Sequence, residues 1–245
     1  MMKRAVIVGA SSGMGREVAL QLLADGWQLG IAARRTQALL QLQAAHPHQV
    51  EVETIDVVQD DAPARLLSLV KKLGGVDLYL HASGIGKQNL DLSPVVELKT
   101  VETNALGFTR MITAIYNYMA AHDGGHIAVI TSIAGTKGLG IAPGYSATKT
   151  FQNSYIQALE QQAHMRHLDI LFTDIRPGFV NTDLLNDSHS YPMLMDVKPT
   201  ASLIVKAIYR KKHIAVIDWR YRCLTAAWRR IPRILWRQLK IKTKG

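Results

Sequence analysis

Seven short apolar runs, rich in valine and isoleucine, recur along this chain of 245 residues. They cover residues 4–8, 28–33, 50–55, 76–81, 126–131, 169–173 and 214–217. The stretches between them are longer and place apolar residues at helical spacing, as at Val18, Leu22 and Leu23. Strands that are apolar on both faces and alternate with helices are typical of a parallel sheet covered by helices on both sides. The pattern therefore predicts an α/β fold with a doubly wound parallel sheet of about seven strands.

The positive charge of the chain is concentrated at its C-terminal end. Residues 1–200 carry 16 Lys and Arg against 18 Asp and Glu, whereas residues 201–245 carry 13 against the single Asp218. A neutral body with a basic end indicates a local partner or surface for that end, rather than nucleic acid bound along the whole molecule. No linker precedes about residue 220, so we expect one domain over residues 1–218 and a basic tail over residues 219–245.

Cysteine usage and hydropathy limit the compartment. Cys223 is the only cysteine, so no disulfide can form within the chain, which suits a reducing compartment. The apolar run over residues 5–8 is too short for a secretory signal, and no run approaches the ~18 apolar residues of a spanning helix. We expect a cytoplasmic or membrane-peripheral protein. We expect no metal site, because histidines such as His164 and His167 lack carboxylate or cysteine companions at ligand spacing.

A glycine-rich turn follows the first predicted strand and precedes a helical pattern that begins at Arg16. It consists of Gly9, Ala10, Ser11, Ser12, Gly13, Met14 and Gly15. Glycines at such a turn let the backbone approach a pyrophosphate, and the N-terminus of the following helix offers N–H groups to the anion. The turn therefore indicates a nucleotide site; the alternative is a purely structural turn, which also uses glycine. Its spacing, G-x-x-x-G-x-G, differs from the commoner G-x-G-x-x-G fingerprint.

The second predicted strand ends in two arginines, Arg34 and Arg35. Sites for NAD usually carry an acidic residue here, whereas an arginine can pair with the 2′-phosphate of NADP. The pair therefore favours NADP; the alternative is two solvated charges at a helix start. Asp56 and His81 lie at the ends of the third and fourth strands, where a ligand crevice is expected. Taken singly, the first would as readily be a helix cap and the second a core histidine.

A tyrosine and a lysine are spaced for one helical turn. Tyr145 precedes Lys149 by four residues, so a helix would place the ammonium beside the phenol and lower its pKa from about 10. Ser132 lies thirteen residues upstream at the end of the fifth strand, where it can face the tyrosine across the crevice. Asn104 lies within a predicted helix, an unfavourable place for asparagine unless its amide has a specific role.

With these motifs in this order, the chain closely resembles the short-chain dehydrogenase/reductase family, in its single-domain NADP(H)-preferring form, over residues 4 to about 218. The resemblance implies a Rossmann-type fold and an oxidoreductase that transfers hydride between nicotinamide and a carbonyl or alcohol. It implies that Tyr145 exchanges the proton and that Lys149 lowers the tyrosine pKa and binds the cofactor ribose. It further implies that Ser132 hydrogen-bonds the substrate oxygen and that Asn104 holds a water linking the lysine to solvent.

The same resemblance assigns the cofactor contacts. The glycine-rich turn, through Gly9, Ser11, Ser12, Gly13, Met14 and Gly15, would hold NADP(H), with Arg34 or Arg35 on the 2′-phosphate. The other contacts that it implies are Asp56, Val57, Ala82, Gly84, Lys149, Pro177, Gly178, Val180 and Thr182. One departure is His81-Ala82-Ser83-Gly84, where the family often has Asn-Ala-Gly. Hydrogen bonds that the family assigns to that asparagine do not carry over directly.

The resemblance places a substrate lid after Thr182. The apolar residues there are Leu184, Leu185, Tyr191, Met193, Leu194 and Met195. They favour an apolar ketone or aldehyde, reduced by NADPH; the alternative is that they only pack the lid onto the body. Relatives usually form homodimers or homotetramers through the helices that hold Asn104 and Tyr145. Two competing functions stay open, namely a non-catalytic dinucleotide-binding sensor or scaffold with the same fold and a membrane-peripheral reductase of lipid-soluble ketones.

The tail is amphipathic. Leu224, Ala227, Trp228, Ile231, Leu235 and Leu239 recur at helical spacing, with basic residues largely on the other side and Pro232 as an interruption. Tryptophan with basic residues is typical of a helix at a membrane interface. Three alternatives stay open, namely peripheral membrane contact, packing on a second subunit and packing on the chain's own body. Nucleic acid is not expected, because no recognition motif accompanies the charge.

Overall fold

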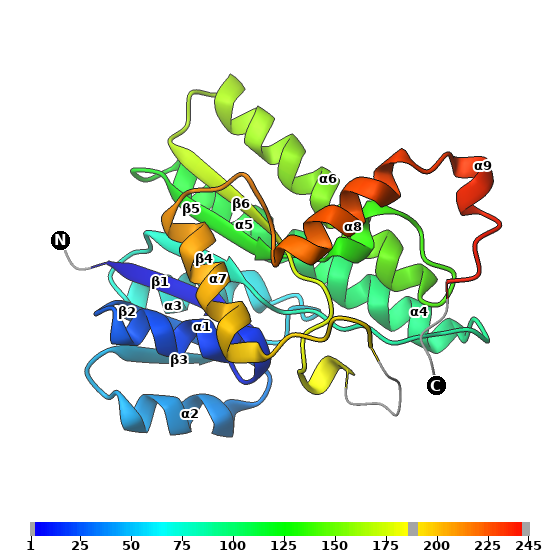
Figure 1. Ribbon diagram of the computed structural model, residues 1–245. Helices are drawn as coiled ribbons and strands as arrows, with labels where there is room; N and C mark the ends of the chain where they lie inside the picture. Colours follow the sequence, from blue (N-terminus) through cyan, green and yellow to red (C-terminus); the bar gives the residue numbers. More distant parts are fainter. Residues whose placement is uncertain (1–2, 186–190, 242–245) are drawn as a thin grey trace.

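The computed structural model of the chain describes residues 3–185 and 191–241. Within these ranges the strands form one parallel sheet in the order β3-β2-β1-β4-β5-β6-β7 (Figure 1). The strands are β1 (Arg4–Val8), β2 (Gln28–Ala33), β3 (Val50–Thr54), β4 (Leu78–His81), β5 (Gly125–Ile130), β6 (Ile170–Arg176) and β7 (Ile214–Val216). Each predicted apolar run contributes one strand, so the predicted doubly wound α/β fold is confirmed.

Helices cover both faces of the sheet (Figure 1). One hydrophobic core is shared by α1 (Gly13–Ala24), α2 (Thr36–Ala45) and α7 (Val197–Tyr209), the other by α3 (Ala62–Lys72), α5 (Phe108–Ala120) and α6 (Pro143–Met165). Strand β1 serves both: Ala5 and Ile7 belong to the first core, Val6 and Val8 to the second. This double burial is why the strands read as continuous apolar runs, each large aliphatic side chain contributing roughly 1.5–3 kcal/mol.

The strand order reverses between β1 and β4. The chain runs from β1 outward through β2 to β3 and then returns to place β4 on the other side of β1. Backbone bonds hold the ends of these strands, with Gly9 N–H donating to Ala32 O and Ala82 N–H donating to Val8 O, each at 2.8 Å. In open α/β sheets such a reversal creates a crevice at the carboxyl ends of the strands, where ligands bind.

The chain also forms shorter helices. They are α4 (Pro94–Val101), the π-helix η1 (Glu102–Gly107), and the 3-10 helices η2 (Ile133–Thr136) and η3 (Asp183–Leu185), of which η2 and η3 line the crevice. The tail forms α8 (Trp219–Arg230) and α9 (Arg233–Trp236). Pro232 is the N-cap of α9, so the predicted amphipathic helix is interrupted where the proline stands.

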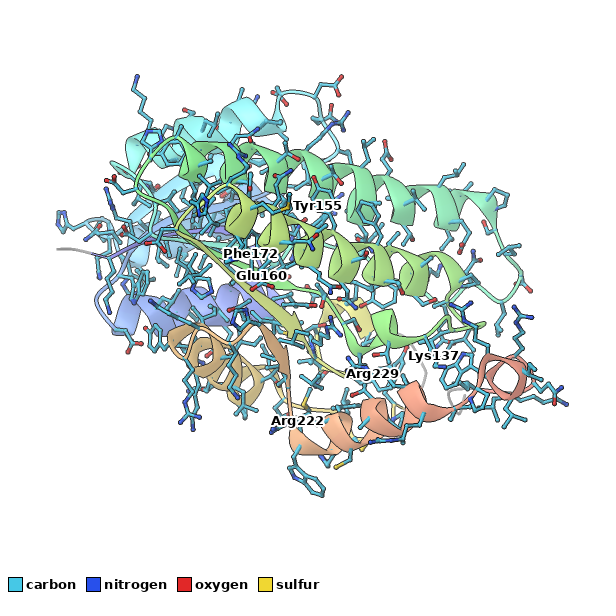
Figure 2. The ribbon with its side chains drawn as sticks, turned by 90° about the horizontal axis from the view of Figure 1, so that it is seen from above. Lys137, Tyr155, Glu160, Phe172, Arg222 and Arg229 are labelled. Atoms are coloured by element: carbon cyan, nitrogen blue, oxygen red, sulfur yellow. The ribbon has the colours of Figure 1, made fainter. Side chains whose placement is uncertain are left out.

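The tail packs on the chain's own body. Tyr221 is fully buried, and Leu224 and Trp228 pack against the first core. Beyond α8, Lys137 Nζ donates to Ile231 O at 2.7 Å and Trp236 Nε1 donates to Gly138 O at 2.8 Å. Figure 2 shows Lys137 beside this segment, with Arg222 and Arg229 on α8.

The predicted interruption at Pro232 separates two parts of the tail. Before it, Leu224 and Trp228 pack on the body, whereas beyond it Leu235 and Leu239 are 55% and 49% exposed and Trp236 of α9 contacts Gly138.

Candidate functional site

The glycine-rich turn is shaped by close backbone packing. Gly9 and Gly13 have φ of +97° and +55°, in the left-handed region that favours glycine. A Cβ on Gly9 would lie 2.6 Å from the main-chain carbon of Ala82, and one on Gly15 would lie 2.3 Å from Gly9 O. The turn therefore packs against the backbone directly after β4, and the N-terminal end of α1, at Gly13 to Gly15, lines the crevice.

A polar cavity of about 410 Å³ lies over this turn. It is lined by Val8, Gly9, Ser11, Ser12, Gly13, Met14, Gly15, Ala33, Arg34, Arg35, Ile55, Ala82, Ser83, Gly84, Ile85, Thr182, Asp183 and Leu184. Ile55 lines it, but the predicted contacts Asp56 and Val57 do not. Val57 is buried against Gly107 instead, where a Cβ would come within 2.8 Å of it.

Arg35 forms the polar rim of this cavity. Its guanidinium donates to Ser11 Oγ at 3.2 Å and also to Ser12 Oγ. It forms an exposed ion pair with Asp183 at 3.4 Å, which such exposure makes weak. Arg34 lines the same cavity. A cation fixed by two hydroxyls fits a phosphate group, so the residues present suit a 2′-phosphorylated dinucleotide.

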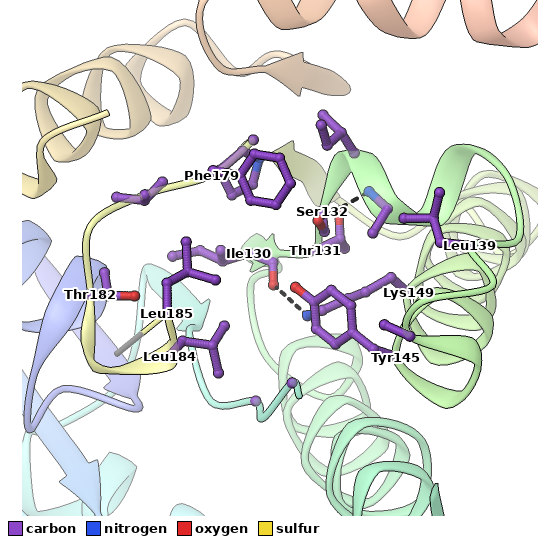
Figure 3. A pocket seen from close by; sticks show the side chains of 18 of the residues that line it. Ile130, Thr131, Ser132, Leu139, Tyr145, Lys149, Phe179, Thr182, Leu184 and Leu185 are labelled. Atoms are coloured by element: carbon purple, nitrogen blue, oxygen red, sulfur yellow. Dashed lines mark hydrogen bonds between the residues drawn. The ribbon is translucent and has the colours of Figure 1, made fainter. Parts of the chain in front are cut away.

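An apolar cavity of about 370 Å³ continues from the polar one. The residues that line both are Met14, Ala82, Ser83, Gly84, Thr182 and Leu184. Ser132, Tyr145 and Lys149 line the apolar cavity, and Figure 3 shows the tyrosine ring beside the lysine chain with the serine opposite. The predicted contacts Pro177, Gly178, Val180 and Thr182 line it as well. The structure thus brings three of the four predicted catalytic residues to one cavity.

Tyr145 stands on the first turn of α6, and Ser132 is the N-cap of η2. The Ser132 hydroxyl accepts from Ala134 N–H at 3.1 Å, which fixes its position. Gly86 lies against the tyrosine, since a Cβ there would be 2.7 Å from its ring. Burial raises the pKa of Tyr145, and the hydrogen bond with Ser132 lowers it by less. In this structure it is therefore Ser132 that acts against burial, and the lowering of this pKa by Lys149 stays a prediction.

Lys149 lies beside Tyr145 and bonds to other groups. Its Nζ lies 5.7 Å from the centroid of the Tyr145 ring and donates to Ile130 O at 3.2 Å and Gln152 Oε1 at 2.9 Å. The ammonium is thus held by neutral acceptors below the phenol. Burial lowers the pKa of Lys149 to about 8, against a smaller raising effect from Asp174. A large share of the lysine is therefore still charged near neutral pH.

Asn104 lies on the π-helix η1 and is fully buried. Its Nδ2 donates to Ile85 O at 2.7 Å, and its Oδ1 accepts from Ile85 N–H at 2.9 Å. A second donation reaches Thr148 Oγ1 at 3.3 Å. The side chain therefore fixes the segment after β4 to α6. The widened π turn is frequent at functional sites and accounts for an asparagine that helix propensity disfavours.

His81, the departure at the end of β4, is a core residue. It is fully buried, and its Nδ1 lies 2.9 Å from Tyr79 Oη. Its Nε2 has no hydrogen-bond partner among the described residues. Burial, with the charge of Lys149, lowers its pKa to about 3, so the imidazole is neutral at ordinary pH. It stands directly before Ala82, where the two cavities meet.

The substrate side is closed by segments that are distant in sequence. Leu184, Leu185 and Tyr191 line the apolar cavity as predicted, whereas Met195 is buried in the core and Leu194 is 46% exposed. Residues 186–190 of the predicted lid lie outside the described part. The tail contributes Trp228 to the cavity wall, a role that the tail pattern alone did not indicate.

Tyr221 of α8 anchors the lid. Its hydroxyl accepts from Phe179 N–H at 3.1 Å and lies 3.0 Å from both Pro192 O and Met193 O. Its ring lies flat on Gly178, where a Cβ would come within 2.2 Å. Sequence reasoning missed this residue, as it missed Gly86 and Gln152. The sequence signal that could have found Tyr221 was Gly178, directly after Pro177, because a glycine often marks backbone that another group approaches closely.

A parallel sheet with a phosphate-type turn at its switch point, and a tyrosine, lysine and serine beside it, defines a dinucleotide-binding oxidoreductase. The model of the short chain dehydrogenase family matches residues 3–191. The chain belongs to this family, whose members bind a nicotinamide dinucleotide.

Individual relatives agree with this membership. An uncharacterized oxidoreductase of Myxococcus xanthus (strain DK1622) is 31% identical over 224 residues, covering 89% of this chain and 88% of that protein. Dehydrogenase/reductase SDR family member 7B of Bos taurus is 30% identical over 191 residues, covering 73% of this chain and 58% of that protein. A short chain dehydrogenase from Burkholderia cenocepacia J2315, solved in complex with NADP, has a TM-score of 0.85 over 98% of both chains at 18% identity. This last likeness shows the common fold.

Two further findings concern the residues with described positions. Among them, no group of three or more His, Cys, Asp or Glu could hold a metal ion. In the same part of the chain, no helix is long and apolar enough to cross a bilayer.

Proposed function

We propose that the protein is an NADP(H)-dependent reductase of apolar ketones or aldehydes. The observation that carries this proposal is the continuity of the two cavities at Ala82, Ser83 and Gly84. One cavity offers Arg35 and backbone N–H groups to a phosphorylated dinucleotide, and the other offers Tyr145 to a substrate between apolar walls. A carbonyl compound without charge fits these walls best.

The residues divide the chemistry. Bound NADPH supplies hydride from C4 of its nicotinamide. Ser132 hydrogen-bonds the carbonyl oxygen, and the Tyr145 hydroxyl donates its proton to that oxygen as the carbonyl carbon accepts the hydride. Burial keeps this phenol protonated at neutral pH, which suits a proton donor. Lys149 holds positive charge beneath the tyrosinate that forms and would bind the cofactor ribose. Solvent then restores the proton to Tyr145.

Cofactor preference is tested by nicotinamide fluorescence with NADPH and NADH. Arg35→Ala is expected to weaken NADPH binding about 10-fold to 100-fold, because one charge-assisted contact is lost. The affinity for NADH is expected to stay within about twofold. Arg65→Ala is the matched control. Arg65 is an exposed arginine on α3 that pairs with Asp61, and its loss is expected to change the affinity for neither nucleotide. Equal losses for both nucleotides would contradict a 2′-phosphate site.

Catalysis is tested by a screen of NADPH-linked ketones and aldehydes. Tyr145→Phe is expected to lower kcat by about 10²–10⁴ and to leave NADPH affinity within about threefold, because only the proton donor is removed. The alternative function, a non-catalytic sensor or scaffold, gains support if wild type binds NADPH but turns over no carbonyl compound in the screen.

We also propose that the protein forms a homodimer or homotetramer through the elements that hold Asn104 and Tyr145. The exposed apolar residues Val95, Leu98 and Phe151 on α4 and α6 support this. Leu98→Glu is expected to lower the mass measured by light scattering to that of a monomer. Leu67→Glu changes an exposed leucine on α3; it is the control and is expected to leave the mass unchanged.

Peripheral contact with anionic membrane is a second proposal for a cytoplasmic protein. Ile234 is 72% exposed beside Arg233 and Arg237, and neither arginine pairs with an acidic residue in the described ranges. Changing three basic residues (Arg229, Arg233, Arg237) to Gln is expected to weaken binding to anionic vesicles about 100-fold, at about 1 kcal/mol per charge. The matched control changes Arg210, Lys211 and Lys212 at the end of α7. If both variants sediment with anionic vesicles to the same extent as wild type, this role is excluded.

A further inference from the structure

Gln152 connects two parts of the candidate active site. It lies on α6, three residues after Lys149, and is fully buried. Its Oε1 accepts from Lys149 Nζ at 2.9 Å, and its Nε2 donates to the main-chain carbonyl of Asn104 at 2.8 Å. Both polar atoms of the amide are therefore used, one on the lysine and one on the π-helix.

This bridge differs from the water that the family resemblance places between asparagine and lysine. A water accepts a proton on one side and releases one on the other. An amide cannot do so without passing through its imidic acid form, because its oxygen only accepts and its nitrogen only donates. A glutamine in this place can hold the ammonium but is a poor proton conductor. It therefore fixes Lys149 rather than linking it to solvent.

We propose that Gln152 is a positioning residue that holds the Lys149 ammonium in its charged form beneath Tyr145. In its catalytic part the inference rests on the proposed reductase function. The geometry supplies the reason: among the described residues, Lys149 Nζ donates to Gln152 and to one main-chain carbonyl, that of Ile130. A buried ammonium needs acceptors, so the amide oxygen stabilises the charged state relative to the neutral amine.

The other titratable groups facing Lys149 act in known directions. Asp174 reaches it from β6 and favours the charged form, although Arg176 pairs with that carboxylate at 2.5 Å. His81 approaches from β4 and is neutral, and Tyr145 lies on the same helix. These groups are unchanged by substitution at position 152, so a shift seen in such variants comes from the residue placed there.

The first experiment uses the protein without cofactor. Thermal unfolding of wild type, Gln152→Met and Gln152→Glu is followed from pH 6.5 to 9.5. The folded-state pKa of Lys149, about 8, lies below its unfolded value of 10.5, so the buried charge is retained below pH 8 and is lost above it. The deficit in Tm of Gln152→Met is therefore expected to be largest at pH 6.5 and to shrink as the pH passes 8, because a neutral amine needs the acceptor less. In a Lys149→Met background the same substitution is expected to give a constant deficit.

The second experiment measures NADPH affinity by fluorescence over the same range. The pH at which affinity falls in alkali is expected to move down by about one unit in Gln152→Met, since a hydrogen bond to a charged group is lost. It is expected to move up in Gln152→Glu, whose carboxylate favours the ammonium. A Tm deficit that is constant with pH would overturn the proposal and reduce Gln152 to a packing role. If wild type binds no NADPH, the proposed reductase function fails, while the unfolding profiles still decide the role of Gln152.

Discussion

The polar and apolar cavities are neighbours, but they are built in different ways. The polar cavity is formed mainly by the turn after β1 and the end of β2, through backbone packing at Gly9 and Gly15. The apolar cavity draws its walls from segments as distant as Met14 and Trp228. The first is made mainly by two short stretches of chain and their main-chain geometry, with smaller contributions from the segments after β3, β4 and β6. The second is made by side chains that only the complete fold brings together.

This difference predicts how each cavity tolerates change. A site made of main-chain atoms in close contact has no side chain that can move aside, so one added methyl group meets rigid neighbours. A site made of apolar side chains can be repacked, so substitutions there are expected to change selectivity more than stability. Each variant below sharpens the comparison or breaks it, in order of decreasing expected effect.

The largest effect is expected from Gly15→Ala in the polar cavity. Its Cβ would lie 2.3 Å from Gly9 O, a main-chain atom, so the turn and α1 must separate. We expect a loss of about 3 kcal/mol or more in unfolding free energy, measured with urea, and at least 100-fold weaker NADPH binding. Gly140→Ala is the control, because nothing lies within 4 Å of a Cβ there. Comparable stability of the two variants would break the comparison.

The same contrast decides what the sequence could reveal. The strands, the glycine turn and the Arg34–Arg35 pair were predictable because each is encoded by a few consecutive residues. The spacing of Tyr145 and Lys149 predicted their shared helix, but not the raised pKa of the phenol, which depends on burial by Gly86 and its neighbours. The tail showed its amphipathic pattern. That Leu224 and Trp228 of this face pack on the body, beside Tyr221 on Gly178, depends on a complementary surface that no local pattern contains.

The next effect tests that surface. Gly178→Ala would place a Cβ 2.2 Å from the ring of Tyr221, and we expect a loss of about 2–3 kcal/mol in unfolding free energy. Tyr221→Leu removes the ring and three hydroxyl contacts, so it is costly alone. The double variant is expected to be more stable than the sum of the single losses predicts, by about 1 kcal/mol or more. Additive losses would show that the lid and α8 are not coupled.

A third effect, small near neutral pH and growing as the pH falls, concerns the junction of the two cavities. The pKa of His81 is about 3 in the folded state against 6.5 unfolded, so the unfolded chain binds the proton first as the pH falls. Stability is therefore complete above pH 6.5 and is lost toward pH 3, by up to about 1.4 kcal/mol per pH unit. His81→Asn is expected to flatten this slope in urea unfolding between pH 6.5 and 4. Buried His126, whose pKa is about 4, keeps its own share of the slope in both proteins.

The control for this measurement is His48→Asn, which changes an exposed histidine that lines neither cavity. It is expected to leave the slope as in wild type. If His81→Asn also keeps the wild-type slope, the imidazole is not held neutral by burial, and the junction is more open to water than its packing indicates.

The smallest effect on stability is expected at Trp228, the tail residue in the apolar wall. It is partly buried and packs edge to face on Trp236 at 5.5 Å between ring centroids. Trp228→Leu should lengthen the cavity toward α8 and lower unfolding free energy by about 1 kcal/mol. With ketones of increasing chain length, the ratio of kcat/KM for long over short substrates is expected to rise about 5-fold to 10-fold. NADPH affinity is expected to stay unchanged, because the polar cavity does not include this residue. A uniform fall for all chain lengths would mean that the tail only supports the lid through Tyr221, and that the apolar cavity ends before it reaches α8.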